Sequence, residues 1–179
     1  MLYKTEAIIL KSNNLGEIDR LITAYSKDLG KILIKAKSVR KNQAKLKGHL
    51  EPFTLSYLMI APAKGFNIIT GAETVNNFSE LKKDLTKLAF SCYIADLVNN
   101  LIAGPEKDTR IWQLLTYTFE ELDKKSEDFF QIIKDFESRI IVFLGYGEDH
   151  KDVGFFIDSL IGKRLPSKIF LQNVVRMVK

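Results

Sequence analysis

Residues 31–50 read KILIKAKSVRKNQAKLKGHL, a stretch that combines a strand pattern with a run of positive charge. Within it, the apolar Ile32, Ile34 and Ala36 recur with a period of two, which predicts a half-buried β-strand. The stretch contains no acidic residue, and its basic residues are Lys31, Lys35, Lys37, Arg40, Lys41, Lys45 and Lys47. The segment therefore carries +7 whereas the whole chain carries +5, so the rest of the chain is slightly acidic.

Four further segments of the first 76 residues have the composition of strands. They are rich in β-branched and aromatic residues and read TEAIILK (5–11), RLITAYS (20–26), FTLSYLMI (53–60) and FNIITGAETV (66–75). Turn-forming residues separate the strands at 13–16, 28–30 and 62–65. Five short strands at this spacing favour a small barrel, so we expect residues 1–78 to form a five-stranded OB-fold β-barrel.

Beyond residue 78 the apolar residues recur at helical spacing. In SELKKDLTKLAFSCYIADLVNNLIA (79–103) this pattern predicts one continuous helix, with Ser79 as its N-cap and Gly104-Pro105 as its stop. Four more helical patterns follow at 109–125, 126–144, 152–162 and 167–178. We therefore expect an all-helical domain over residues 79–179 and an α+β fold class for the chain.

The basic stretch favours a nucleic-acid-binding surface. Lys31, Lys35 and Lys37 share the strand face opposite the apolar residues, and residues 40–47 form the connection to the next strand. A phosphate backbone is the natural complement of such a surface, because each neutralised phosphate releases counterions. OB-folds often add aromatic side chains on which bases stack, and the candidates are Tyr3, Tyr25, Tyr57 and Phe66.

Other interpretations of the same features stay open. A lysine-rich loop is often only a solvated connection, and the aromatic residues of a barrel usually belong to its core. The same surface would also suit a general OB-fold module for RNA or single strands, or a scaffold that meets an acidic protein. Competition between DNA and RNA, and the dependence of affinity on salt, would separate these interpretations.

Composition argues against an enzyme, a metal centre and a membrane protein. Cys92 is the single cysteine and the two histidines are His49 and His150, so the usual tetrahedral zinc ligands are missing. The chain has no phosphate-binding glycine loop, no nucleophile elbow and no zinc-protease motif. It has no apolar run of 18 residues and no signal-peptide pattern. We expect a cytoplasmic protein without a cofactor, a metal or catalytic activity.

Four motifs, in order along the chain, resemble the bacterial RecO family of recombination mediators. The first is an aliphatic strand with a hairpin and a basic strand start, carried by Gly16, Glu17, Asp19, Arg20, Gly30 and Lys31. The second is a Leu-x-Pro-Phe strand at Leu50, Pro52 and Phe53. The third is a helix that ends in Leu144, Gly145 and Tyr146. The fourth is a C-terminal segment with Gly162, Lys163, Leu165, Ser167 and Lys168.

One departure from the family pattern concerns the region between about 147 and 153. Members of the family often carry an insertion here that holds four zinc-binding cysteines. In this chain only GEDHKDV separates the two helical patterns, and it contains no cysteine. The chain therefore resembles a short form of the family that lacks the zinc-binding insertion.

The resemblance implies an N-terminal OB-fold, a helical C-terminal domain and no enzymatic turnover. It implies binding to single- and double-stranded DNA at the nucleoid, annealing of complementary strands, and work with RecR that replaces single-strand-binding protein by RecA. The acidic, apolar tail of single-strand-binding protein is the implied ligand of the helical domain. Arg139 and Lys168 lie in the matched segments and are the candidate contacts for that tail.

Overall fold

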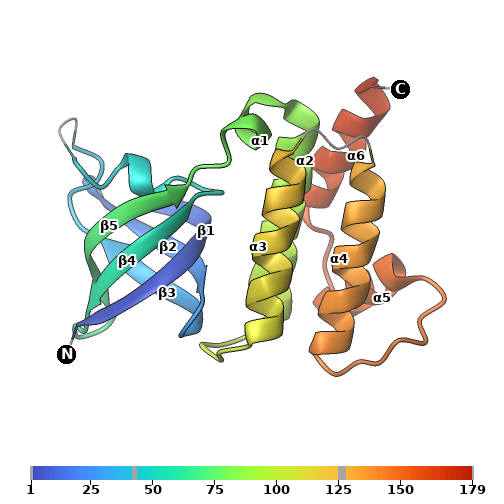
Figure 1. The fold of residues 1–179 in the computed structure, drawn as a ribbon, viewed down its shortest axis with the longest axis horizontal. Coiled ribbons are helices and arrows are strands. Elements are labelled where there is room, and N and C mark those ends of the chain that lie inside the picture. The colour runs from blue at the N-terminus through green and yellow to red at the C-terminus, as the bar shows by residue number, and fades with distance from the viewer. Residues whose placement is uncertain (1, 42–43, 125–127, 179) are drawn as a thin grey trace. The chain divides into compact units, whose positions relative to one another are not determined.

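The computed structural model describes residues 2–41, 44–124 and 128–178 (Figure 1). The chain forms two compact units. The first contains Met1–Asn77 together with Ala103–Asp108, and the second contains Phe78–Ile102 together with Thr109–Lys179.

The first unit is a closed barrel whose strands neighbour one another in the order β1-β2-β3-β5-β4. The strands are β1 (Tyr3–Leu15), β2 (Asp19–Ser26), β3 (Gly30–Ala36), β4 (Leu55–Ala61) and β5 (Ile68–Asn76). Adjacent strands are antiparallel except β3 and β5, which run parallel. The five-stranded barrel confirms the fold class predicted from the sequence.

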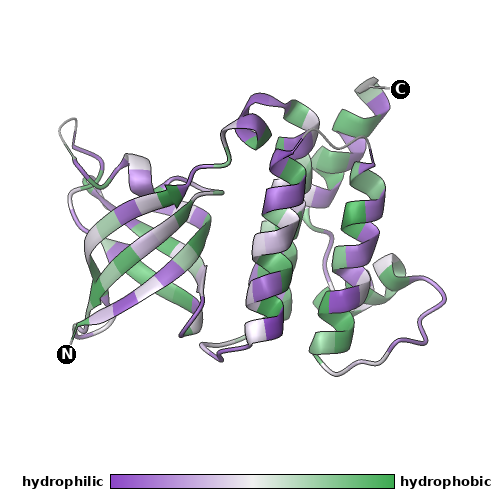
Figure 2. Ribbon diagram, in the orientation of Figure 1, coloured by the Kyte–Doolittle hydropathy of each residue, from purple (hydrophilic) through white to green (hydrophobic). Residues whose placement is uncertain are grey.

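Hydrophobic and hydrophilic residues alternate along the strands, as the colour bands of Figure 2 show. Ile22, Ile34 and Leu58 are among the residues of the buried core cluster. Strand β1 pairs with both β2 and β4, and its register with β2 shifts between Ile9 and Lys11. Such a bulge bends a strand, which lets one long strand contribute to both sides of a closed barrel.

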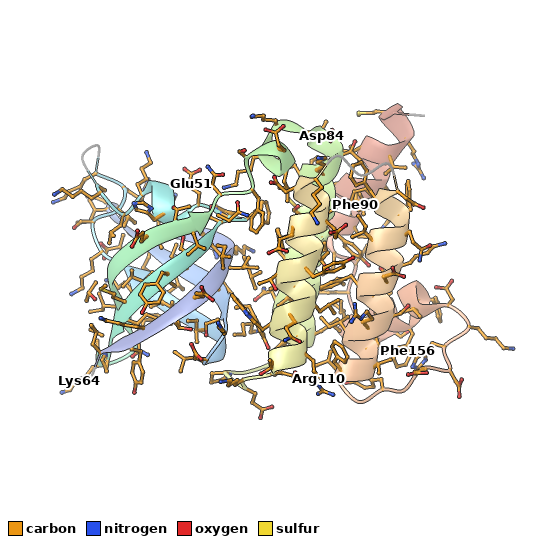
Figure 3. The ribbon with its side chains drawn as sticks, viewed as in Figure 1. Glu51, Lys64, Asp84, Phe90, Arg110 and Phe156 are labelled. Carbon is orange, nitrogen blue, oxygen red and sulfur yellow. The ribbon has the colours of Figure 1, made fainter. Side chains whose placement is uncertain are left out.

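The second unit is entirely helical in the part of the chain that the structure describes. Its helices are α1 (Ser79–Lys83), α2 (Leu85–Leu101), α3 (Thr109–Asp123), α4 (Phe129–Phe143), α5 (Val153–Ile161) and α6 (Pro166–Val178). Helix α2 contacts the other five helices of this unit and is buried around most of its circumference. Phe90, labelled in Figure 3, is fully buried on α2 and contacts the rings of Phe129 and Phe130.

The prediction of one continuous helix over 79–103, capped by Ser79, is wrong. Asp84 adopts an extended backbone, and its side chain accepts hydrogen bonds from the backbone N–H groups of Thr86 and Lys87. Asp84 is therefore the N-cap of α2, because a short carboxylate satisfies the free N–H groups of a first helical turn. Ser79 is instead the first residue of α1, and the N-cap position there belongs to Phe78.

No helix in the described ranges combines the length and the apolar character that crossing a bilayer would require.

Candidate nucleic-acid interface

Strand β3 displays lysines on its outer side. Ile34 and Ala36 are buried in the barrel, as the alternation predicts, while Lys35 is half-buried and Lys37 is exposed just beyond the strand. Lys31 lies at the other end of β3, where burial lowers the pKa of its ammonium group. The basic residues of β3 therefore differ in their access to solvent, and Lys37 is the most available of the three.

The connection after β3 is anchored to the barrel by apolar residues. Val39 and Leu50 are buried in the core cluster, and Leu46 packs against it. Lys41, Lys45 and Lys47 alternate with these anchors and are exposed. Together with Lys37, these lysines form no ion pair within the part of the chain that the structure describes. Their charges are thus free to meet an external anion.

Two of the seven predicted basic residues also hold the hairpin between β1 and β2. The guanidinium of Arg40 donates to the carbonyl of Gly16 at 2.8 Å, and its backbone N–H donates to the carbonyl of Ile18. Lys35 forms an ion pair with Asp19, with 2.7 Å between Nζ and Oδ2. Arg40 and Lys35 therefore have partners within the fold. A phosphate that contacted either residue would compete with those partners or be bound in addition to them.

Asp19 is the acid that this arrangement brings to the basic surface. Its carboxylate accepts a hydrogen bond from Lys35 and another, at 2.8 Å, from the backbone N–H of Ser38. The bond from Lys35 and then the one from Ser38 hold the pKa of Asp19 below its ordinary value. Asp19 stays ionised near neutral pH and reduces the positive charge of the surface beside Lys35.

A hollow of about 380 Å³ lies beside the end of β3 and brings in residues from a distant part of the chain. We call it the barrel hollow, and its lining includes Leu15, Lys35, Lys37, Lys64, Phe66 and Ile68. The parallel pairing of Lys35 with Ile68, with a 2.8 Å bond from the Lys35 N–H to the Asn67 carbonyl, places the β4–β5 loop against β3. Lys64 is labelled on that loop in Figure 3.

Sequence reasoning missed Lys64 because it is separated from the basic stretch. The signal that could have found it is the turn Pro62-Ala63-Lys64-Gly65 between two strands of a barrel whose fifth strand must close against the third. Lys64 is exposed and adds a cation to the lining of the barrel hollow, which also includes Lys37.

The four aromatic candidates have different environments. Phe66 is 42% exposed and Tyr3 is 38% exposed, while Tyr57 is half-buried. Tyr25 is fully buried, and its hydroxyl donates to the carbonyl of Asp108 at 3.4 Å. Burial raises the pKa of Tyr25 to about 12. The prediction that Tyr25 stacks on bases is wrong, because its ring has no free face. Phe66 is the candidate that lines the barrel hollow.

Among the predicted partner-binding residues of the helical unit, Lys168 already has a partner. Its ammonium group lies 2.7 and 2.8 Å from the two carboxylate oxygens of Asp158 and sits 5.9 Å from the centre of the Tyr93 ring. Its side chain is only 23% exposed. Tyr93 in turn donates to Glu137 at 2.6 Å, and burial raises the pKa of that carboxyl. Lys168 therefore belongs to a largely buried polar cluster.

Arg139 is exposed and lines two hollows on either side of helix α4. The first, which we call the α3–α4 groove, has a volume of about 360 Å³ and is lined by Arg110, Tyr117, Ile132, Asp135, Arg139 and Phe143, among others. The guanidinium groups of Arg110 and Arg139 lie 5.1 and 5.9 Å from the centre of the Phe143 ring. This groove thus offers two cations, one acid and an apolar floor.

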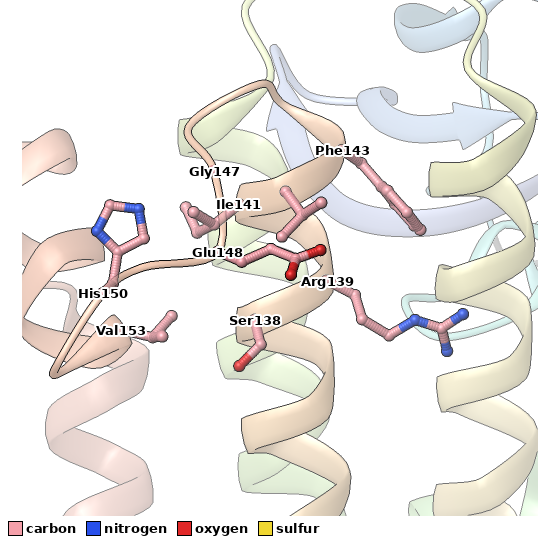
Figure 4. A pocket seen from close by; sticks show the side chains of 9 residues that line it. Ser138, Arg139, Ile141, Phe143, Gly147, Glu148, His150 and Val153 are labelled. Atoms are coloured by element: carbon pink, nitrogen blue, oxygen red, sulfur yellow. The ribbon is translucent and has the colours of Figure 1, made fainter.

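The second hollow, of about 440 Å³, lies between α4 and the connection to α5 (Figure 4). Glu148 and His150 line it together with apolar residues such as Ile141 and Val153. In Figure 4 the Arg139 guanidinium points away from His150. The Glu148 carboxylate balances the single arginine, so this hollow is a poorer site for an acidic ligand than the α3–α4 groove.

The described residues do not form a recognisable metal site. No three His, Cys, Asp or Glu side chains among residues 2–41, 44–124 and 128–178 converge in a way that could hold a metal ion. Cys92 is half-buried, and burial raises the pKa of its thiol, which disfavours the thiolate that a metal would bind. His150 stacks on Phe156, with 3.8 Å between ring centres, and its Nε2 lies 2.9 Å from the Tyr146 carbonyl oxygen.

Comparison with known proteins matches two family models to the chain. Residues 1–78 match the model described as recombination protein O N terminal, and residues 82–151 match recombination protein O C terminal. Together the two models cover most of the chain.

Individual relatives carry the name DNA repair protein RecO. The one from Dehalococcoides mccartyi strain 195 is 35% identical over 144 residues, which are 80% of this chain and 56% of the relative. The one from Thermoanaerobacter sp. strain X514 is 28% identical over 81% of this chain and 58% of the relative. The one from Trichodesmium erythraeum is 32% identical over 83% and 51%. The match thus spans a little over half the length of these relatives.

Proposed function

The chain belongs to the recombination protein O family, and from that premise we propose that it acts in DNA repair and recombination by binding DNA through its barrel. In this proposal residues 1–78 are the nucleic-acid-binding domain and residues 79–179 are the partner-binding domain. The chain acts as a mediator near the nucleoid and carries out no catalysis.

The observation that carries the proposal is the barrel hollow with its neighbouring loop. Lys37 and Lys64 are exposed at the hollow, and Lys41, Lys45 and Lys47 are exposed on the anchored connection that follows Lys37 in the chain. In the described part of the chain, the lining of the hollow includes no acidic residue, and the neighbouring Asp19 is paired with Lys35. Such a surface attracts phosphates through counterion release and makes few contacts that could read a base sequence. Binding to single- and double-stranded DNA without sequence preference follows.

The same surface offers a physical route to strand annealing. Two complementary strands repel each other through their phosphates, and a basic surface that neutralises some of those charges lowers the repulsion. We propose that the protein anneals complementary strands in this way. Cooperation with RecR, and the replacement of single-strand-binding protein by RecA, complete the proposal and rest on family membership.

The helical unit is the proposed site for the acidic tail of single-strand-binding protein. The α3–α4 groove supports this choice, because Arg110 and Arg139 would meet carboxylates while Phe143 and Ile132 would contact an apolar end. Lys168, by contrast, is engaged by Asp158 and is a weak candidate for a direct contact. Arg139 is therefore a better candidate contact than Lys168, while Arg110 beside it in the groove already donates to the Phe143 carbonyl at 3.2 Å.

The test is equilibrium binding of fluorescent single-stranded and duplex DNA at several salt concentrations. The Lys37→Ala, Lys64→Ala double variant should weaken both ligands alike and lower the slope of log affinity against log salt by about one for each phosphate contact that it removes. The matched control removes Lys134 and Lys163, two exposed lysines of the helical unit. Equal effects of the two double variants would reject the barrel as the DNA site. Tighter binding of RNA than of DNA would favour a general RNA-binding module instead.

A further inference from the structure

We infer that Phe66 is a stacking platform for an unpaired base, and that it makes the barrel hollow prefer single strands to duplex. This inference rests on the proposed binding of DNA by the barrel. The lysines of the hollow cannot distinguish single strands from duplex, because phosphates are present in both forms of DNA. The inference assigns that distinction to the side chain of Phe66.

Phe66 leaves a large part of its side chain exposed at the edge of the barrel. Its ring is 42% exposed, whereas the barrel core is closed by aliphatic residues on the strands. The loop that carries it includes Gly65, whose φ of +85° is a conformation that favours glycine. An exposed phenylalanine at a loop leaves apolar area in contact with water, and a stacked base would remove that area from water.

Although it is exposed, Phe66 is held in place. The next residue, Asn67, accepts the backbone hydrogen bond from Lys35 at 2.8 Å, and Ile68 then pairs with β3. The backbone at Phe66 is therefore tied to the edge of the barrel, one residue away from a strand contact. A loop backbone that is already held loses little conformational freedom when a base stacks on its side chain, which favours binding.

The surroundings of Phe66 suit a nucleotide. Lys35, Lys37 and Lys64 line the same hollow, so a base on the ring would have its phosphates within a basic rim. Lys35 already forms an ion pair with Asp19, so Lys37 and Lys64 are the better phosphate contacts. The volume of about 380 Å³ lies within the range of sites that hold small organic ligands.

Selectivity follows from which bases have a free face. In a duplex both faces of each base are covered by its neighbours, whereas an unpaired base can leave its own stack and cover an aromatic ring. Stacking is tolerant of sequence because every base has a π-face. Phe66 should therefore increase the affinity for single strands of any sequence and leave duplex binding unchanged.

The experiment compares three ligands of equal length: an oligothymidylate, the corresponding abasic strand with the same phosphates, and a duplex. Phe66→Ala should weaken binding of the oligothymidylate by about tenfold and leave the other two ligands within about twofold. Phe66→Tyr keeps a ring and should restore tight binding. Leu33→Ala is the matched control, because Leu33 is 44% exposed on β3 and is not part of the hollow's lining.

Two results would overturn the inference. Loss of affinity for all three ligands in Phe66→Ala would mean that the residue shapes the loop rather than contacting a base. No loss for any ligand would mean that bases do not reach the ring. If Lys37→Ala, Lys64→Ala still weakens all three ligands, the proposed DNA binding stands without the stacking. If the unaltered protein binds none of them, both proposals fail together.

Discussion

Lys35 and Asp19 form an ion pair on the outside of the barrel, with 2.7 Å between Nζ and Oδ2 and with side chains that are 29% and 17% exposed. The pair places one negative charge at the edge of a surface that otherwise attracts phosphates. The Asp19 carboxylate also accepts a hydrogen bond from the backbone N–H of Ser38, which stabilises the fold. Its charge therefore opposes DNA binding while its hydrogen bonds support the barrel.

Asp19→Asn separates these two roles, because an amide oxygen can still accept from Ser38 but the charge is gone. We expect the variant to bind DNA about two- to fivefold more tightly at low salt, since water and salt screen a single charge near a protein surface. Fluorescence anisotropy over a salt series measures this. Glu120→Gln removes the same charge from an exposed position of α3 and should have no effect. Equal gains from both variants would mean that only net charge matters.

Asp19 also predicts a pH dependence of stability. Its pKa in the folded protein is below the ordinary 3.8, so the carboxylate stabilises the fold fully above that value. The stabilisation is lost as pH falls through the lowered pKa of the folded state. The difference in melting temperature between the unaltered protein and Asp19→Asn should thus be largest above about pH 4 and shrink in stronger acid. Circular dichroism from pH 7 to pH 2 measures it, and a constant difference would contradict the assignment.

Gly30 and Gly16 form a natural pair for testing a close approach within the first unit. Both have positive φ, +68° and +66°, but a Cβ on Gly30 would overlap the backbone carbonyl of Glu106, whereas one on Gly16 would meet open space. Gly16→Ala should cost about 1–2 kcal/mol of unfolding free energy from backbone strain alone. Gly30→Ala adds the overlap and should cost about 2–5 kcal/mol.

Urea denaturation followed by circular dichroism compares these two alanine variants. A cost at Gly30 no larger than the cost at Gly16 would mean that the segment from Ala103 to Asp108 does not rest on the β2–β3 turn in solution.

The strands and helices could be predicted from local patterns, but the break at Asp84 could not. Apolar residues continue at helical spacing through Leu81, Leu85 and Leu88, so the period alone gives no sign of an interruption. The break occurs because the Asp84 side chain accepts hydrogen bonds from two backbone N–H groups. These bonds compete with the backbone bonds that would continue the helix. A residue that favours helix caps therefore ended one helix and began another within an unbroken pattern.

The candidate site was predictable only where it is local in sequence. The lysines of residues 31–50 lie in one run, and their alternation with apolar anchors is readable. Lys64 joins them through the closure of β5 against β3, and Asp19 joins them through the pairing of β2 with β3. Which charges lie side by side on neighbouring strands depends on the register of those strands. The sequence pattern does not specify that register for residues outside the run.

The α3–α4 groove gives the last prediction, which concerns a peptide that ends in acidic and apolar residues, like the proposed tail. Such a peptide should bind the full chain with a dissociation constant on the order of micromolar, because a flexible ligand loses conformational freedom when it is ordered. Arg139→Ala should weaken it by about tenfold or more, the usual contribution of a hydrogen bond to a charged group. Arg139 is exposed, so its removal should leave the melting temperature unchanged.

Lys134 supplies the control for this titration, since it is an exposed cation on the same helix and is absent from the groove's lining. Lys134→Ala removes the same charge and should leave peptide binding intact, as measured by isothermal titration calorimetry. Lys168→Met should instead lower the melting temperature, because it leaves Asp158 without its 2.7 Å partner beside the cluster of Tyr93 and Glu137. If Arg139→Ala and Lys134→Ala behave alike while Lys168→Met alone abolishes binding in a folded protein, the peptide site lies at the polar cluster around Lys168 rather than in the groove.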